Sequence, residues 1–139
     1  MKRWLIDTGP FVAYFDDTDP LHKPASASID AFSGQLVTTG PVITEVMYFL
    51  ADAPDGPNAL AEFVTAAGVQ IADATQPLQI HAAVELMSKY RDTPMDFADA
   101  SLVLLAEELN VTDILTLDRR GFSTYRTSRG MKFRLVLRV

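Results

Sequence analysis

Cysteine is absent from this chain of 139 residues, and histidine occurs only twice. Without cysteine there can be no disulfide framework, no thiolate zinc site and no cysteine nucleophile. The longest apolar run has six residues, at positions 46–51, whereas a membrane-spanning helix needs ~20. The first apolar stretch reaches Asp7 after three residues, so we expect no signal peptide and a cytoplasmic protein.

The composition is that of an ordinary globular protein. Hydrophobic residues make up 48% of the chain and charged residues 22%, which argues against disorder. A chain of this length suits one domain, residues 1–139, and buries roughly two-thirds of its unfolded surface on folding. It therefore needs no disulfide bond or structural metal ion to fold.

The net charge of −6 is unevenly distributed. Residues 1–118 contain all 18 acidic residues and only five basic ones. The remaining seven basic residues are Arg119, Arg120, Arg126, Arg129, Lys132, Arg134 and Arg138. Such a segment is typical of a phosphate-binding surface. However, apolar residues alternate with Arg134, Val136 and Arg138 from position 133 to 139, which equally predicts an edge strand with arginine facing water.

Strands and helices are predicted to alternate along the chain. The expected strands are residues 3–6, 35–39, 69–72, 113–117 and a final strand near the C-terminus. The expected helices are one with Pro10 as its first residue, then 23–32, 41–51, 58–67, 77–90 and a long one that residues 93–96 open and that runs to about residue 110, with the rest irregular. This order predicts a parallel sheet with helices on both faces. In such sheets the functional site lies beyond the carboxyl ends of the strands.

Two acidic residues directly follow predicted strands. Asp7 comes after the first strand and Asp118 after the strand that ends at residue 117. Each has an ordinary structural explanation, because Asp7 could cap the next helix, unless Thr8 or Gly9 does so, and Asp118 could occupy a turn. Thr116 points to the same side as Asp118 and could hydrogen-bond to a carboxylate or a bound water.

Three more acids lie on predicted helices. No lysine or arginine stands three or four residues from Glu45, and a buried unpaired carboxylate costs several kcal/mol. Either Glu45 reaches solvent at the edge of the helix or, as we expect, a cation meets it from elsewhere in the fold. Asp96 and Asp99 project from one helix face, where like charges repel. Thr93 and Asp96 have the spacing of a capping box, which leaves Asp99 as the better candidate for chemistry.

These acids could converge on one edge of the sheet. Clustered carboxylates raise one another's pKa values and destabilise the fold unless a cation neutralises them. Oxygen ligands select hard divalent ions such as Mg²⁺ or Mn²⁺, and an ion held this way can activate a water and stabilise charge on a phosphodiester. The sequence leaves open whether one ion or two would bind.

Four segments follow one another along the chain: Leu5-Ile6-Asp7-Thr8-Gly9, Thr44-Glu45, Asp96-Phe97-Ala98-Asp99-Ala100-Ser101-Leu102 and Thr116-Leu117-Asp118-Arg119-Arg120-Gly121-Phe122. Taken in this order, they resemble the PIN domain family, and in particular its VapC-type toxin ribonucleases. The resemblance covers nearly the whole chain. It implies a three-layer α/β/α PIN-like domain over residues 1–139, with a central, mainly parallel sheet of about five strands.

The resemblance also implies a metal-dependent endoribonuclease, the toxin of a toxin–antitoxin pair, that uses Mg²⁺ or Mn²⁺ to hydrolyse RNA. It assigns catalysis to Asp7, Glu45, Asp99 and Asp118, metal binding to Asp7, Asp99 and Asp118, and supporting roles to Asp96, Thr116 and Thr8. VapC-type relatives often carry an acid where this chain has Gly121, which leaves Asp118 as the only acid of its segment. The implied partners are an RNA substrate, a cognate antitoxin and a second copy of the chain in a homodimer. We expect no association with a membrane.

Three other functions compete with this interpretation. A catalytically idle PIN-like scaffold that binds a protein or RNA partner is the main alternative, although the complete acid set argues against it. A phosphatase of the haloacid dehalogenase type needs a second aspartate at the position of Gly9. A signalling receiver domain could use Asp73 as its phosphorylated residue, but the strand end at 116–118 offers no lysine.

Overall fold

The computed structural model describes residues 1–138, and a five-stranded sheet forms its centre. The strands are β1 (Arg3–Ile6), β2 (Gln35–Thr39), β3 (Gln70–Ala72), β4 (Asp113–Leu115) and β5 (Arg134–Leu135). They lie in the order β3-β2-β1-β4-β5, and every neighbouring pair is parallel. The predicted central parallel sheet of about five strands is confirmed.

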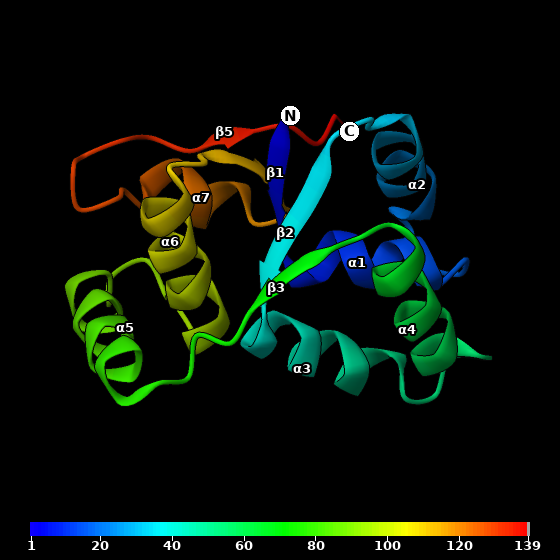
Figure 1. Ribbon diagram of the computed structural model, residues 1–139, viewed down its shortest axis with the longest axis horizontal. Helices are drawn as coiled ribbons and strands as arrows, with labels where there is room; N and C mark the ends of the chain where they lie inside the picture. Colours follow the sequence, from blue (N-terminus) through cyan, green and yellow to red (C-terminus); the bar gives the residue numbers. More distant parts are fainter. Residues whose placement is uncertain (139) are drawn as a thin grey trace.

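Helices cover both faces of this sheet. They are α1 (Thr8–Phe15), α2 (His22–Ala31), α3 (Gly40–Leu50), α4 (Gly56–Ala66), α5 (Pro77–Lys89), α6 (Phe97–Leu109) and α7 (Arg119–Thr124). Figure 1 shows α5, α6 and α7 on one side of the sheet and α1, α2 and α4 on the other, which confirms the three-layer α/β/α architecture. Within residues 1–138, no helix combines the length and apolar character needed to cross a membrane.

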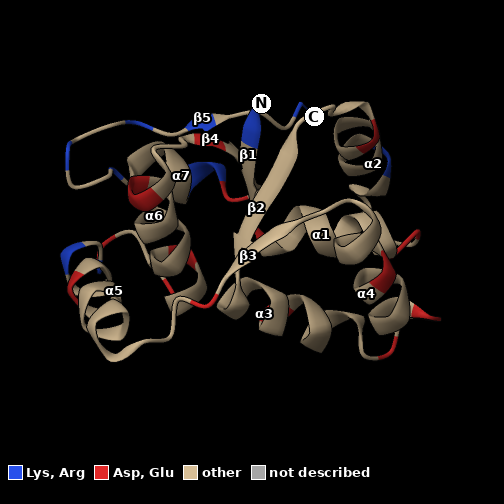
Figure 2. Ribbon diagram, in the orientation of Figure 1, with Lys and Arg blue, Asp and Glu red and all other residues tan. Residues whose placement is uncertain are grey.

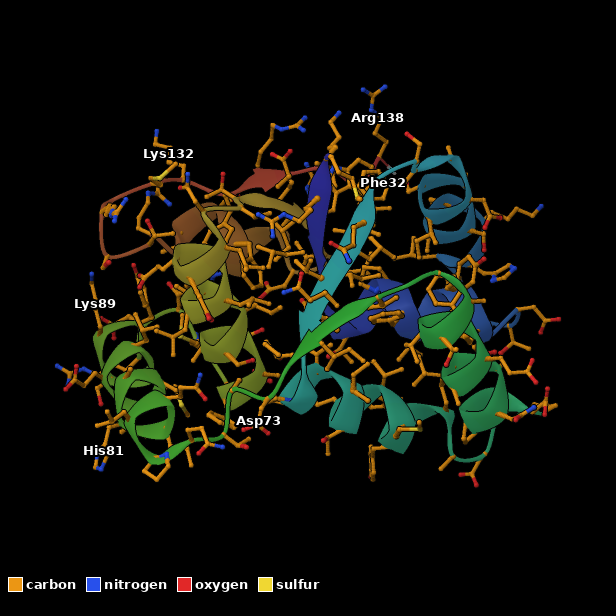
Figure 3. All side chains as sticks on the ribbon, viewed as in Figure 1. Phe32, Asp73, His81, Lys89, Lys132 and Arg138 are labelled. Carbon is orange, nitrogen blue, oxygen red and sulfur yellow. The ribbon has the colours of Figure 1, made fainter. Side chains whose placement is uncertain are left out.

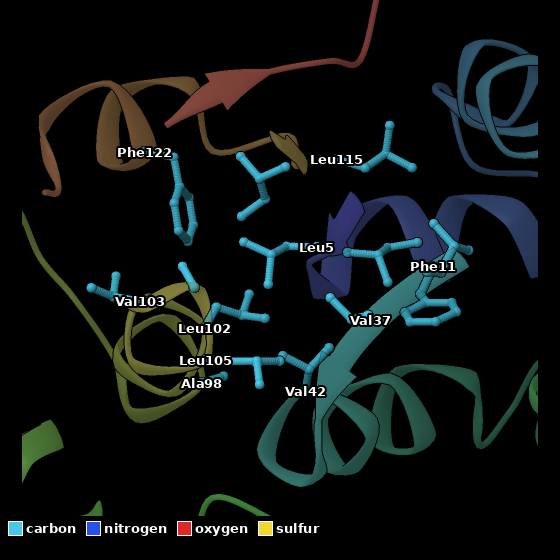
Figure 4. Close-up of a cluster of buried hydrophobic side chains, with 14 of the residues drawn as sticks. Leu5, Phe11, Val37, Val42, Ala98, Leu102, Val103, Leu105, Leu115 and Phe122 are labelled. Atoms are coloured by element: carbon cyan, nitrogen blue, oxygen red, sulfur yellow. The ribbon is translucent and has the colours of Figure 1, made fainter. Parts of the chain in front are cut away.

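The core lies where α6 packs against the central strands. Leu5 of β1 and Leu115 of β4 are completely buried, because parallel strands with helices on both faces have no solvent-exposed side. Figure 4 shows Leu102 and Leu105 of α6 directed toward Val42 of α3 across this core. This packing fixes the start of α6 relative to the carboxyl edge of the sheet.

Hydrogen bonds join the strand ends at that edge. The backbone N–H of Asp7 donates to the Leu115 carbonyl at 3.0 Å, which aligns the end of β1 with the end of β4. The buried hydroxyls of Thr39 and Ser101 lie 2.7 Å apart and connect the end of β2 to α6. The residues that follow β1, β2 and β4 are therefore held close together, at the edge where the site was expected.

The C-terminal segment forms the predicted solvated edge strand, although β5 is short. Phe133 and Leu137 are buried, whereas Arg134 and Arg138 are exposed. Arg134 makes a bidentate ion pair with Asp113, with both N–O distances at 2.8 Å. The alternation predicted for the edge strand holds at residues 133, 134, 137 and 138, whereas Leu135 and Val136 are both half-buried, and Val139 lies outside the described residues.

One predicted feature of this region was wrong. The chain after residue 117 was expected to be irregular, but residues 119–124 form α7. Asp118 caps this helix by accepting a hydrogen bond from the backbone N–H of Gly121. A single short turn of helix has too few residues to show a helical hydrophobic period, and only its cap could have indicated it.

Candidate active site

Asp7 lies deep in the site, with 7% of its surface exposed. It is the N-cap of α1, because its Oδ1 accepts a hydrogen bond of 2.8 Å from the backbone N–H of Thr8. Its Oδ2 accepts a bond of 2.7 Å from the Thr116 hydroxyl. Burial raises the pKa of Asp7 to about 6, even though both hydrogen bonds lower it. Asp7 therefore caps a helix and also presents a buried carboxylate whose charge is only partly stabilised.

Thr116 and Asp118 extend the site from β4 toward α7. The Thr116 hydroxyl accepts a hydrogen bond of 3.0 Å from the backbone N–H of Asp118, so one side chain contacts both strand-end acids. The Asp118 Oδ1 in turn accepts a bond of 2.9 Å from the N–H of Gly121. A Cβ at position 121 would clash with the Asp118 carboxylate, so this conformation of Asp118 requires glycine there.

Asp96 and Asp99 form a reciprocal capping box at the start of α6. Asp96 Oδ1 accepts from the Asp99 N–H at 2.8 Å, and Asp99 Oδ2 accepts from the Asp96 N–H at 3.1 Å. The prediction that Thr93 pairs with Asp96 was wrong, because α6 begins at Phe97 and makes Asp96 the N-cap. Burial, followed by the charges of Asp7 and Asp96, raises the pKa of Asp99 to about 8.

Glu45 joins the site from α3 through Thr8. The Thr8 hydroxyl donates a hydrogen bond of 2.7 Å to Glu45 Oε1. Burial raises the pKa of Glu45, and the nearby carboxylate of Asp96 raises it further. No lysine or arginine pairs with Glu45 among the described residues, so the cation expected there stays a prediction. Within residues 1–138, the ion pair that forms is the one between Arg134 and Asp113, outside this group of acids.

The five acids act on one another electrostatically. The charges of Asp96 and Asp118 raise the pKa of Asp7, and the charge of Asp7 raises that of Asp99. Among the described residues, no lysine, arginine or histidine forms an ion pair with any member of the group. Like charges gathered without a counter-charge destabilise a fold, so the arrangement favours binding of a cation. We call Asp7, Glu45, Asp96, Asp99 and Asp118 the acid cluster.

The chemistry of the acid cluster fits a hard divalent cation, since all its donors are carboxylate oxygens. Its hydrogen bonds leave room for a metal, because each carboxylate has about four lone-pair sites. Over residues 1–138, no three His, Cys, Asp or Glu side chains form a ready ligand set. Mg²⁺ does not need one, because it usually keeps several waters and binds through one or two carboxylates together with substrate phosphates.

Tyr125 borders the acid cluster, and sequence reasoning missed it. Its side chain is completely buried, and its hydroxyl donates a hydrogen bond of 2.7 Å to the Pro94 carbonyl. Burial raises the pKa of Tyr125, and the charges of Asp99 and Asp118 raise it further, so the hydroxyl remains a donor. It thereby holds the segment that leads into α6. Tyr125 directly follows α7, so only the prediction of that helix could have drawn attention to it.

A recess of about 580 Å³ opens beside the acid cluster. Its lining includes Glu45 and Asp96 together with Pro41, Thr44, Asp73, Thr75 and Phe97. These residues come from the start of α3, the start of α6 and the connection from β3 to α5. Figure 3 labels Asp73 in that connection, near the amino ends of α3 and α6. The site therefore combines a charged centre with an adjoining hollow.

Comparison with known proteins identifies relatives of this chain. The model of the PIN domain family matches residues 4–127. The chain is 33% identical over 134 residues to Ribonuclease VapC26 of Mycobacterium tuberculosis, across 95% of this chain and 98% of that protein. The crystal structure of VapC20 from the same organism, described as a Sarcin-Ricin loop cleaving toxin, matches with a TM-score of 0.74. That match covers 85% of this chain and 91% of VapC20 at 18% identity, and it supports the fold alone.

Proposed function

The chain belongs to the PIN domain family, and on this basis we propose that it is a divalent-metal-dependent endoribonuclease that hydrolyses RNA phosphodiester bonds. The observation that carries the proposal is that the charge of Asp118 raises the pKa of Asp7 and the charge of Asp7 raises the pKa of Asp99, beyond the burial that raises both. The similarity to Ribonuclease VapC26 supports RNA as the substrate.

Mg²⁺ or Mn²⁺ is the proposed cofactor, held by Asp7, Asp99 and Asp118. When bound, such an ion lowers the pKa of a water and offsets charge that develops on a phosphodiester. The protein contributes the negative charge and its orientation. Thr116 fixes the carboxylate of Asp7 and the backbone of Asp118. Two further hydrogen bonds orient the other acids. The backbone N–H of Asp99 donates to the Asp96 carboxylate, and the Thr8 hydroxyl donates to the Glu45 carboxylate.

Exposed cations that follow Asp118 support the binding of an RNA backbone. They are Arg119, Arg120, Arg129 and Lys132. Figure 2 shows basic positions, in blue, along α7 and the segment that leads to β5. Two other basic residues have structural roles, since Arg134 pairs with Asp113 and Arg126 donates to backbone carbonyls at the end of α7. Contacts of free cations with phosphates provide affinity that does not depend on base sequence.

We also propose that the protein acts in the cytoplasm as the toxin of a toxin–antitoxin pair and forms a homodimer. The 33% identity to Ribonuclease VapC26 and the VapC-type segments of the sequence motivate this proposal. Induced expression should arrest growth, and co-expression of a cognate antitoxin should restore it. Light scattering should give twice the mass of the 15.3 kDa chain. Undisturbed growth would argue against the toxin role, and a single-chain mass would argue against the homodimer.

Cleavage of a structured RNA in Mn²⁺ tests the proposed activity. Asp99→Asn should abolish cleavage without unfolding the protein. Asp92→Asn is the matched control, because Asp92 is an exposed acid outside the acid cluster and its replacement makes the same chemical change from carboxyl to carboxamide. It should cleave like wild type. Unchanged cleavage by Asp99→Asn would contradict the proposal. Wild type that cleaves no RNA with either ion would favour the idle scaffold.

A further inference from the structure

We propose that the recess beside Glu45 and Asp96 binds a nucleobase of the RNA substrate next to the cleaved bond, and that it prefers bases carrying an amino group. We call it the base recess. This inference rests on the proposed ribonuclease function and adds a site of recognition to it. Three features support it: the position of the recess, the chemistry of its walls and the acceptor at its rim.

The base recess is continuous with the acid cluster. Glu45 and Asp96 belong to both, so a phosphodiester held at the cluster would have its neighbouring nucleoside at the mouth of the recess. At the recess the start of α3 packs closely against the segment after β3, because a Cβ on Gly40 would lie 3.1 Å from the Asp73 carbonyl. A second pocket, of about 600 Å³, lies beside His22 and Phe49. No residue of the acid cluster lines it, so it does not share the position that supports the base recess.

The walls of the base recess suit a flat apolar ring better than a phosphate. Pro41, Phe97 and Ala98 provide apolar surface, and Phe97 is an aromatic residue that is only partly buried. Bases bind to aromatic side chains through their faces, and this interaction is available to every base. The carboxylates of Glu45 and Asp96 line the recess, are not among the proposed metal ligands, and repel a phosphate from it. A base can therefore enter while its backbone stays at the acid cluster.

Asp73 supplies the preference among bases. Its carboxylate accepts hydrogen bonds of 2.8 Å from the Thr75 hydroxyl and 2.9 Å from the Gln76 amide, and these contacts lower the pKa of Asp73. The side chain is thus held as an ionised group that can only accept hydrogen bonds. Adenine, cytosine and guanine offer such a group an exocyclic amino group with two N–H donors, whereas uracil offers only its ring N3–H.

The first test fills the recess by Thr44→Trp. Thr44 is exposed in α3, and its hydroxyl donates only to the Gly40 carbonyl at 3.0 Å. Thr65→Trp is the matched control, because Thr65 is exposed in α4 and its hydroxyl donates to Ala61 at 3.1 Å. Both variants are given a pool of single-stranded RNA of random sequence in Mn²⁺, and the new RNA ends are sequenced.

Wild type and Thr65→Trp should disfavour uracil at one position beside the cut. Thr44→Trp should lose that preference and raise KM by roughly 5- to 150-fold, the range expected when one stacked base is lost. Asp73→Asn, which adds a donor to the rim, should admit uracil. If Thr44→Trp kept both the base preference and the KM of wild type, the inference would be overturned.

A second test does not depend on cleavage. Adenosine, cytidine, guanosine and uridine, which carry no phosphate, are added at millimolar concentration in EDTA, and binding is followed by ligand-observed NMR. The first three should bind wild type and Thr65→Trp more strongly than uridine does, and Thr44→Trp should bind none. Nucleoside binding without RNA cleavage would refute the proposed function and leave the recess standing. RNA cleavage without any nucleoside binding would refute the recess alone.

Discussion

Replacing Thr116 by valine should destabilise the metal-free protein more at high pH than at low pH. Valine keeps the shape of threonine but lacks the hydroxyl that donates to Asp7 at 2.7 Å and accepts from the Asp118 N–H at 3.0 Å. Thr116 is 1% exposed, so water cannot take over either hydrogen bond. The substitution therefore removes two contacts without changing the packing volume much.

The size of the effect depends on whether Asp7 is ionised. A hydrogen bond to a charged group contributes about 1.5–3 kcal/mol, and an unpaired Asp118 N–H costs about 1–3 kcal/mol more. Burial raises the folded-state pKa of Asp7 from 3.8 to about 6, so its ionisation costs stability as pH rises through that interval. Without the Thr116 hydroxyl this pKa rises further, and the loss of stability continues to higher pH.

Urea unfolding at about pH 5 and about pH 8 in EDTA measures the difference, since these values lie on either side of the folded-state pKa of Asp7. The fluorescence of Trp4, the only tryptophan, reports unfolding because its ring stacks on Phe32 at 3.9 Å. The penalty of Thr116→Val should be about 1–3 kcal/mol larger at the higher pH. Thr116→Ser keeps the hydroxyl and should remove that dependence on pH. A penalty that is the same at both pH values, or equal for serine and valine, would refute the reasoning.

Three further predictions concern single positions. Asp99→Asn should raise the melting temperature of the metal-free protein at about pH 8. The pKa of Asp99 is raised from 3.8 to about 8, so its ionisation costs stability over that interval. Calorimetry below about pH 4 should show little difference between the variant and wild type. Gly121→Ala should displace the Asp118 carboxylate and reduce both RNA cleavage and urea stability, and wild-type values of both would contradict the contact. Arg134→Ala should cost no more than about 1 kcal/mol in urea unfolding, because Arg134 is 62% exposed beside Asp113, and the cost should shrink in high salt.

Most of the architecture can be predicted from the sequence, because the local pattern of apolar and polar residues agrees with the burial of the same residues in the fold. The strand at 35–39 has its predicted bounds, and most predicted helices differ from the observed ones by one or two residues at each end. The shift from the predicted start at Pro10 to the observed start at Thr8 illustrates the limit, since a proline in the first turn of a helix does not fix its first residue. The positions of Asp7 and Asp118 follow from the strand ends, because parallel strands finish at one edge.

Contacts between distant residues could not be predicted in this way. Thr8 and Glu45 are 37 residues apart, and only the packing of α1 against α3 brings the hydroxyl to the carboxylate. Absence of a local partner marked Glu45 as unusual but did not identify its partner. Tyr125 carried no local signal either, because its importance comes from burial beside Asp99 and Asp118. Burial of this kind is a property of the tertiary structure rather than of any short segment.

The central claim is that the acid cluster forms a divalent-metal site. Calorimetric titration of Mn²⁺ and Mg²⁺ into wild type and Asp99→Asn, at a pH of about 8 where the carboxylates can ionise, tests it most directly. The account predicts that wild type binds at least one of the ions and that Asp99→Asn loses this binding while remaining folded. Wild type that binds neither ion, or Asp99→Asn that binds as tightly as wild type, would contradict it.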